Sequence, residues 1–142
     1  MFCHQNLHHN KTRTSLETAS VYHISGNCIA KSGILEDESG YVMVVVPASH
    51  QLDMSRVHEQ MLRPLILATE NELPRLFTDC DLGAIPPIGD AYDMETLIDD
   101  SLAEQTDIYF EAGDHEMLVH VDSENFSYMT ADAIHGDFSR HL

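Results

Sequence analysis

Lys31 is one of two lysines in the chain, and it lies inside an apolar segment, residues 28–35. Its small neighbours leave space around the ammonium group, which can hold a carbonyl or hydroxyl oxygen and stabilise negative charge developing there. The alternation of Ile29, Lys31 and Gly33 also permits a lysine on the solvent-exposed face of a strand. The residues alone favour the solvent-exposed interpretation, and the pocket interpretation stays open.

A second candidate is the segment Gly-Ala-Ile-Pro-Pro-Ile-Gly at residues 83–89. Glycine lets a ligand approach the backbone closely, and proline holds the chain rigid. The same composition also suits a buried connection that binds nothing. The residues do not separate these two interpretations.

Two histidine-containing segments could bind a metal or move a proton. Residues 113–116, Gly-Asp-His-Glu, have the composition of a hairpin turn, and that interpretation is favoured. His50 and Asp53 match no metal-binding helix spacing, and Asp53 is explained as a helix cap. We therefore expect neither a bound metal nor a cofactor. Sequence patterns of serine hydrolases, NTPases and dinucleotide-binding proteins are also missing.

The charge balance restricts the partners. The 142 residues include 24 Asp and Glu against 7 Lys and Arg, a net charge of −17, and this length predicts one domain. Anionic membranes and the phosphate backbone of DNA are bound by clustered basic residues, so we expect neither as a partner. The expected ligand is small, cationic or a protruding end of a larger molecule.

Three widely spaced cysteines and a polar N-terminus predict a cytoplasmic protein with reduced thiols.

Hydrophobic periodicity and turn signals predict an α+β domain with a mixed, strongly curved sheet. A capping box at Thr14 and Glu17 predicts the first helix, and Asp122 or Ser123 is expected to cap the last. We expect residues 131–142 to be weakly structured. Helices are predicted at 15–23, from Asp53 to Met61, at 72–77 and after Asp122. Strands are predicted at 28–35 and 41–46 as a hairpin, at 64–68, at 96–99, and at 107–111 and 116–121 as a second hairpin; residues 78–90 form a loop.

Six segments, taken in order and spacing, carry a resemblance that spans about residues 14–129. They are residues 15–19, 30–35, 46–53, 83–89, 98–100 and 109–116. Together they resemble the YbaK-type aminoacyl-tRNA editing family, which includes freestanding deacylases and the editing insertion of bacterial prolyl-tRNA synthetases. The resemblance implies a mixed α/β fold with a curved, partly barrel-like sheet. It also suggests an editing domain at residues 14–130, between a short segment at 1–13 and a tail at 131–142.

The resemblance implies a pocket marked by a strand lysine and a G-x-x-x-P loop, which Lys31 and residues 83–87 match. Because of this match, Lys31 is interpreted as lining a pocket rather than facing solvent, and it is the expected catalytic residue. The expected substrate-binding residues are Gly83, Ala84, Ile85, Pro87, Asp99, Asp100, Gly113 and His115.

The activity implied by the resemblance is metal-independent hydrolysis of the ester in a mischarged tRNA. The amino acid released is expected to be small. The expected partner is the acceptor end of that tRNA, and an aminoacyl-tRNA synthetase is a candidate second partner. Two alternatives stay open. One is a non-catalytic module of the same fold that binds an aminoacyl or nucleotide-like ligand or a synthetase. The other, ranked last, is a metal hydrolase using His50 and His115.

Overall fold

A long antiparallel hairpin forms the centre of the molecule. The computed structural model describes residues 4–8, 24–69, 87, 94–111 and 117–142. Strands β2 (Ile29–Asp37) and β3 (Gly40–Pro47) pair from Ala30 to Asp37, which confirms the predicted hairpin. The Asp37 carboxylate accepts a hydrogen bond from the Ser39 amide at 2.8 Å, and Gly40 has a φ of 128°, a conformation that favours glycine. The turn therefore follows from local residue chemistry.

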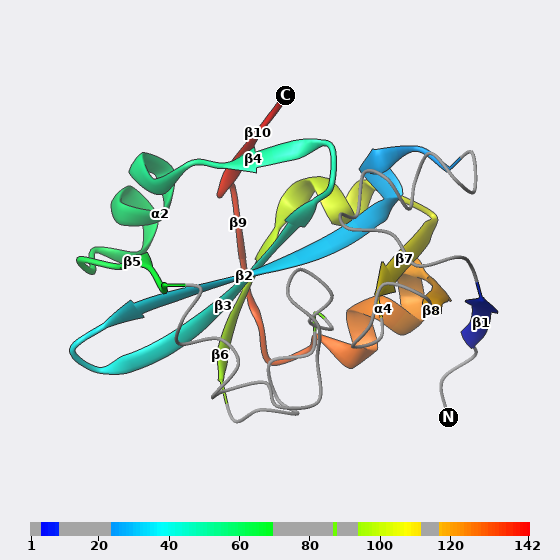
Figure 1. Ribbon diagram of the computed structural model, residues 1–142, viewed down its shortest axis with the longest axis horizontal. Coiled ribbons are helices and arrows are strands. Elements are labelled where there is room, and N and C mark those ends of the chain that lie inside the picture. Colours follow the sequence, from blue (N-terminus) through cyan, green and yellow to red (C-terminus); the bar gives the residue numbers. More distant parts are fainter. Residues whose placement is uncertain (1–3, 9–23, 70–86, 88–93, 112–116) are drawn as a thin grey trace.

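A mixed sheet extends from both sides of this hairpin (Figure 1). Its order is β1, β8, β7, β2, β3, β6 and β9, with β5 paired to β2 beside this path. The pairs β2–β7, β3–β6 and β6–β9 are parallel, whereas β1–β8, β7–β8 and β2–β3 are antiparallel. The predicted mixed α/β class is confirmed, with β1 and β9 at the two ends of the strand order. The added strands are β1 (His4–His8), β5 (Ile66–Leu67), β6 (Glu95–Asp99), β7 (Asp107–Glu111), β8 (Met117–Asp122) and β9 (Ile134–Gly136).

The two faces of the sheet bury separate apolar clusters. Along β3, Met43 and Val45 pack with Ile98 and Phe110 on one face, whereas the intervening valines belong to the second cluster. This second cluster contains Val42, Val44, Val46, Val57, Leu97 and Phe138. The continuous apolar run of β3 therefore reflects a strand buried on both faces.

Two helices begin where the sequence predicts. Helix α2 (Met54–Met61) is capped by Asp53, whose carboxylate accepts hydrogen bonds from the amides of Ser55 at 3.1 Å and Arg56 at 3.3 Å. Helix α4 (Ser123–Met129) is capped by Asp122. The strands predicted at 64–68, 96–99, 107–111 and 116–121 correspond to β5, β6, β7 and β8.

The expectation of weak structure at residues 131–142 is wrong. Strand β9 pairs in parallel with β6, and strand β10 (Ser139–His141) pairs with β4 (His50–Leu52) in a second, two-stranded sheet. Between them, Phe138 is fully buried. Order in this segment comes from pairing with distant strands, which local sequence patterns do not reveal.

Strand β1 is a further element that the sequence analysis did not predict. The helices predicted at 15–23 and 72–77 lie outside the described residues, as does the loop predicted at 78–90 apart from Pro87. None of the helices in the described segments has the length and apolar character of a membrane span.

Candidate active site

Lys31 lies on the wall of a cavity. It pairs with Val46 across the hairpin, so its side chain shares a face of the sheet with Val44 and Val46. The residue is half-buried, and its Nζ donates a long hydrogen bond of 3.5 Å to the carbonyl oxygen of Ala48. Burial lowers the pKa of Lys31 below its ordinary value. The structure therefore favours the pocket interpretation over a fully solvated lysine.

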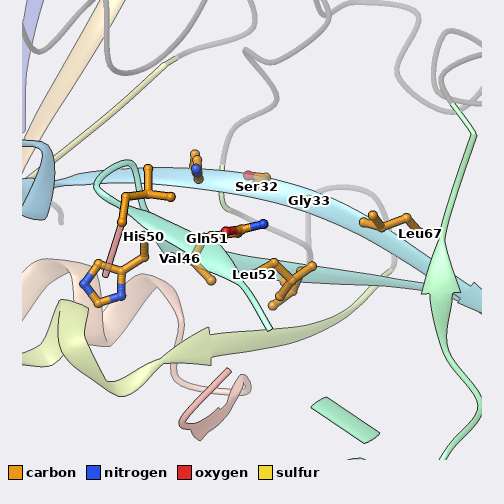
Figure 2. A pocket seen from close by; sticks show the side chains of 10 residues that line it. Ser32, Gly33, Val46, His50, Gln51, Leu52 and Leu67 are labelled. Carbon is orange, nitrogen blue, oxygen red and sulfur yellow. The ribbon is translucent and has the colours of Figure 1, made fainter. Parts of the chain in front are cut away.

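The cavity has a volume of about 260 Å³ and is largely apolar (Figure 2). Lys31, His50, Gln51 and Ser32 contribute the polar side chains of its lining. Among the residues that the structure describes, it is lined by Lys31, Ser32, Gly33, Val44, Val46, His50, Gln51, Leu52, Leu67 and Leu142. An apolar cleft with a few polar groups is the usual form of a small-molecule site.

Gly33 contributes to the open space. It lies opposite Val44 in the hairpin, and a Cβ atom at position 33 would lie 3.4 Å from Val44 Cγ1. A side chain there would fill part of the wall beside Lys31. The small residue therefore enlarges the cavity at this point.

His50 lies on β4, which follows β3 closely in the chain. Its Nδ1 lies 2.9 Å from Ser139 Oγ, and its ring contacts the ring of His141 edge-on at a centroid distance of 5.1 Å. Burial lowers the pKa of His50, and the nearby charges of His141 and Lys31 lower it further, against the opposite effects of Asp99 and Asp137. The net lowering of the pKa favours the neutral imidazole.

A second, more polar cavity of about 380 Å³ adjoins His50. It is lined by His50, Arg56, Asp99, Asp100, Ser101, Glu104, Asp137, Ser139, Arg140 and His141. Two predicted substrate-binding residues, Asp99 and Asp100, thus lie together in this cavity, and Lys31 lines the first one. His50 lines both cavities.

Asp99 also has a clear structural role. It is 2% exposed, and its Oδ1 accepts a hydrogen bond of 2.8 Å from the amide of Phe138. Its Oδ2 accepts from the amide of Ser101 at 3.1 Å and from the Ser101 hydroxyl group. Asp99 therefore anchors the C-terminal segment to β6, whereas Asp100 is exposed.

The structure leaves several predicted site residues untested. Pro87 is described and buried. Those outside the described residues are Gly83, Ala84, Ile85, Gly113 and His115.

The sequence analysis missed the part of the cavity that β4 and the C-terminal segment supply. It considered His50 only as a metal ligand, and it assigned no role to Leu52 or Leu142. The available signal was the alternation of His50 and Leu52 after Pro47, which places both on one face of a short strand. Within the described ranges, no group of three or more His, Cys, Asp or Glu residues could hold a metal ion.

The chain is similar to a family model in sequence and to solved proteins in structure. Residues 9–127 match the family model described as aminoacyl-tRNA editing domain. None of the curated proteins matches the chain. The structure of hypothetical protein APE2540 is similar, with 24% identity, a TM-score of 0.85, and coverage of 97% of this chain and 92% of that one.

Two further solved structures share the fold. One is described as a "putative trans-editing enzyme for prolyl tRNA synthetase", with 22% identity, a TM-score of 0.85, and coverage of 96% of this chain and 87% of the other. The second is described as a signal transduction protein from Marinobacter aquaeolei VT8, with 18% identity and a TM-score of 0.77. The match covers 96% of this chain and 27% of that longer one.

Proposed function

The chain belongs to the aminoacyl-tRNA editing domain family, and on this basis we propose that it is a deacylase that hydrolyses the ester of a mischarged tRNA. The observation that carries the proposal is the half-buried Lys31 on the wall of an apolar cavity. A cavity of about 260 Å³ suits a small aminoacyl group, and its valine and leucine lining suits a small side chain. The amino acid that is released is therefore expected to be small.

In the proposed reaction, the ammonium group of Lys31 faces the ester carbonyl or the terminal ribose. There it orients the ester and stabilises the negative charge that develops on the carbonyl oxygen as water attacks. The backbone of residues 83–87 is proposed to position the substrate, with Asp99, Asp100, Gly113 and His115 as further binding candidates. The free ribose hydroxyl assists the hydrolysis, and the proposed reaction needs neither a metal nor a cofactor.

The proposed partner is the acceptor end of the tRNA. Its terminal adenosine and aminoacyl group reach the cavity, while the rest of the tRNA makes few contacts with an acidic protein of net charge −17. A synthetase that holds the tRNA is a proposed second partner. We propose the cytoplasm as the compartment, because tRNA is aminoacylated there.

The test is a deacylation assay with purified protein over a panel of tRNAs mischarged with alanine, cysteine, serine and larger amino acids. We expect turnover of at least one tRNA carrying a small amino acid. Substitution Lys31→Ala should reduce the rate by about 10²–10³, the loss typical of removing a group that stabilises an oxyanion. Lys31→Met is the matched control, since it preserves most of the side-chain volume and removes only the charge.

Three outcomes contradict parts of this proposal. A wild-type protein that hydrolyses no member of the panel is a binding module rather than a deacylase. A Lys31→Met variant with wild-type turnover removes the proposed role of the charge. Loss of activity on addition of a chelator would favour the metal hydrolase. Circular dichroism of each variant shows whether the fold is preserved.

A further inference from the structure

His50 lies where the two cavities meet. The apolar cavity extends from it along β4 towards Leu67, and Figure 2 shows His50 and Leu67 at opposite ends of the labelled lining. The polar cavity, which is lined by carboxylates, arginines and serines, also has His50 in its lining. A substrate in the apolar cavity and a water molecule entering from the polar one would therefore meet at this side chain.

The ring of His50 is fixed from the C-terminal strand. Strands β4 and β10 pair with His50 opposite His141, and the buried Ser139 supplies the hydroxyl group that contacts Nδ1 at 2.9 Å. No hydrogen bond to Nε2 is found within the described residues. An imidazole oriented through one nitrogen while the other stays available is the arrangement of a general base with an orienting partner.

Charged and titratable groups surround the ring on several elements. Lys31 from β2 and His141 from β10 disfavour the imidazolium form, whereas Asp99 from β6 and Asp137, just before β10, favour it. Burial is the largest effect and lowers the pKa of His50 below its ordinary value. The neutral form of the ring, which can accept a proton, is therefore favoured.

We propose that His50 is the general base that activates the attacking water, an inference that rests on the proposed deacylase function. As the water oxygen bonds to the ester carbonyl carbon, Nε2 takes a proton from that water. The bond from the carbonyl carbon to the ribose oxygen then breaks, and the proton passes from Nε2 to the leaving ribose oxygen. The products are the free amino acid and a tRNA with an intact terminal ribose.

The assignment is tested by pH–rate profiles of deacylation for the wild type, His50→Gln and a control, His135→Gln. His135 is exposed on β9 and lines neither of these two cavities. We expect His50→Gln to lower kcat by about 10²–10⁴ with KM little changed, the range for loss of a general base. The wild-type rate should fall as the pH drops through the His50 pKa, which burial lowers, and this acid limb should be missing in His50→Gln.

Two further measurements separate catalysis from folding. His50→Ala should regain part of its activity on addition of imidazole, which replaces a missing base but does not repair a misfolded protein. Ser139→Ala retains the imidazole and loses the group that orients it, so kcat should fall less than in His50→Gln. A His50→Gln variant with wild-type rate and pH profile overturns the assignment, as does a His50→Ala variant that is folded, inactive and not rescued. Absence of wild-type turnover instead overturns the deacylase proposal, and this inference with it.

Discussion

Gly33 determines how much space adjoins the proposed catalytic lysine. A methyl group at this position would contact Val44 Cγ1 at 3.4 Å and reduce the cavity beside Lys31. We expect Gly33→Ala to fold normally and to lower kcat/KM more for larger aminoacyl groups than for smaller ones. One methyl group in an apolar pocket discriminates by about 10–200-fold.

The measurement for Gly33→Ala is competition between two mischarged tRNAs in one deacylation reaction. Ser39→Ala is the control, because Ser39 is exposed at the hairpin tip and lines neither described cavity. An unchanged ratio of the two rates in Gly33→Ala would mean that the aminoacyl side chain does not lie against this wall.

At the residue scale, sequence proximity decided what could be predicted. The family resemblance assigned Lys31 to a pocket, and the hairpin in which it pairs with Val46 could be predicted from nearby residues. His50 could not, because its orienting hydroxyl belongs to Ser139, which is 89 residues away. Nothing in the spacing of these two residues indicates that they meet.

At the element scale, the C-terminal segment contributes to the core through Phe138. This side chain is fully buried in the same apolar cluster as Val57 and Leu97. We expect Phe138→Ala to destabilise the protein by about 3–5 kcal/mol, as for other buried phenylalanines. Chemical denaturation monitored by circular dichroism measures this loss.

Tyr128→Ala is the matched control for Phe138→Ala, since Tyr128 is also an aromatic residue near the C-terminus but is 74% exposed. Its free energy of unfolding should change by less than that of Phe138→Ala, because far less apolar surface of Tyr128 is buried. Equal effects of the two substitutions would contradict the packing of Phe138 in the core.

The elements that were predicted correctly are those whose sequence signals come from neighbouring residues. The Asp53 cap and the hairpin turn before Gly40 each depend on residues close in sequence. Strands β9 and β10 have three residues each, and their order depends on partners far away in the chain. Short strands of this kind carry too little periodicity for a sequence pattern to reveal them.

At the scale of the whole molecule, charge limits how tRNA is held. Arg63 bonds Asp37 and Glu95, and Arg56 bonds Asp137, so at least two of the seven Lys and Arg residues are engaged with carboxylates within the described part of the chain. The Arg63 guanidinium lowers the pKa of Asp37, chiefly through their hydrogen bond. Few cations therefore remain for phosphate contacts.

We expect the salt dependence of kcat/KM to be shallow for that reason. A protein that makes six to ten phosphate contacts loses about 10³–10⁵ in affinity between 50 and 200 mM salt, whereas one or two contacts predict a loss of about 10-fold or less. The measurement is kcat/KM for one mischarged tRNA over this salt range, with an aminoacylated minihelix as the control substrate. A steep loss for the full tRNA alone would reveal phosphate contacts beyond the acceptor end.

The fold class and the family could be predicted from the sequence, because the segments that resemble the family are spread along most of the chain. The shape of the cavity was not, since it depends on how β4 and β10 pair and on where Leu142 lies. Composition predicted an acidic protein whose ligand is small, cationic or a protruding end of a larger molecule, and that expectation stays a prediction.

The pairing of β4 with β10 also bears on the order of folding. These strands occupy residues 50–52 and 139–141, so one wall of the cavity forms only when two segments that are far apart in the chain meet. Contacts between such distant segments form slowly, because closing a long loop costs conformational entropy. During refolding, the β2–β3 hairpin should therefore return before the binding cavity, and recovery of activity should lag behind recovery of secondary structure.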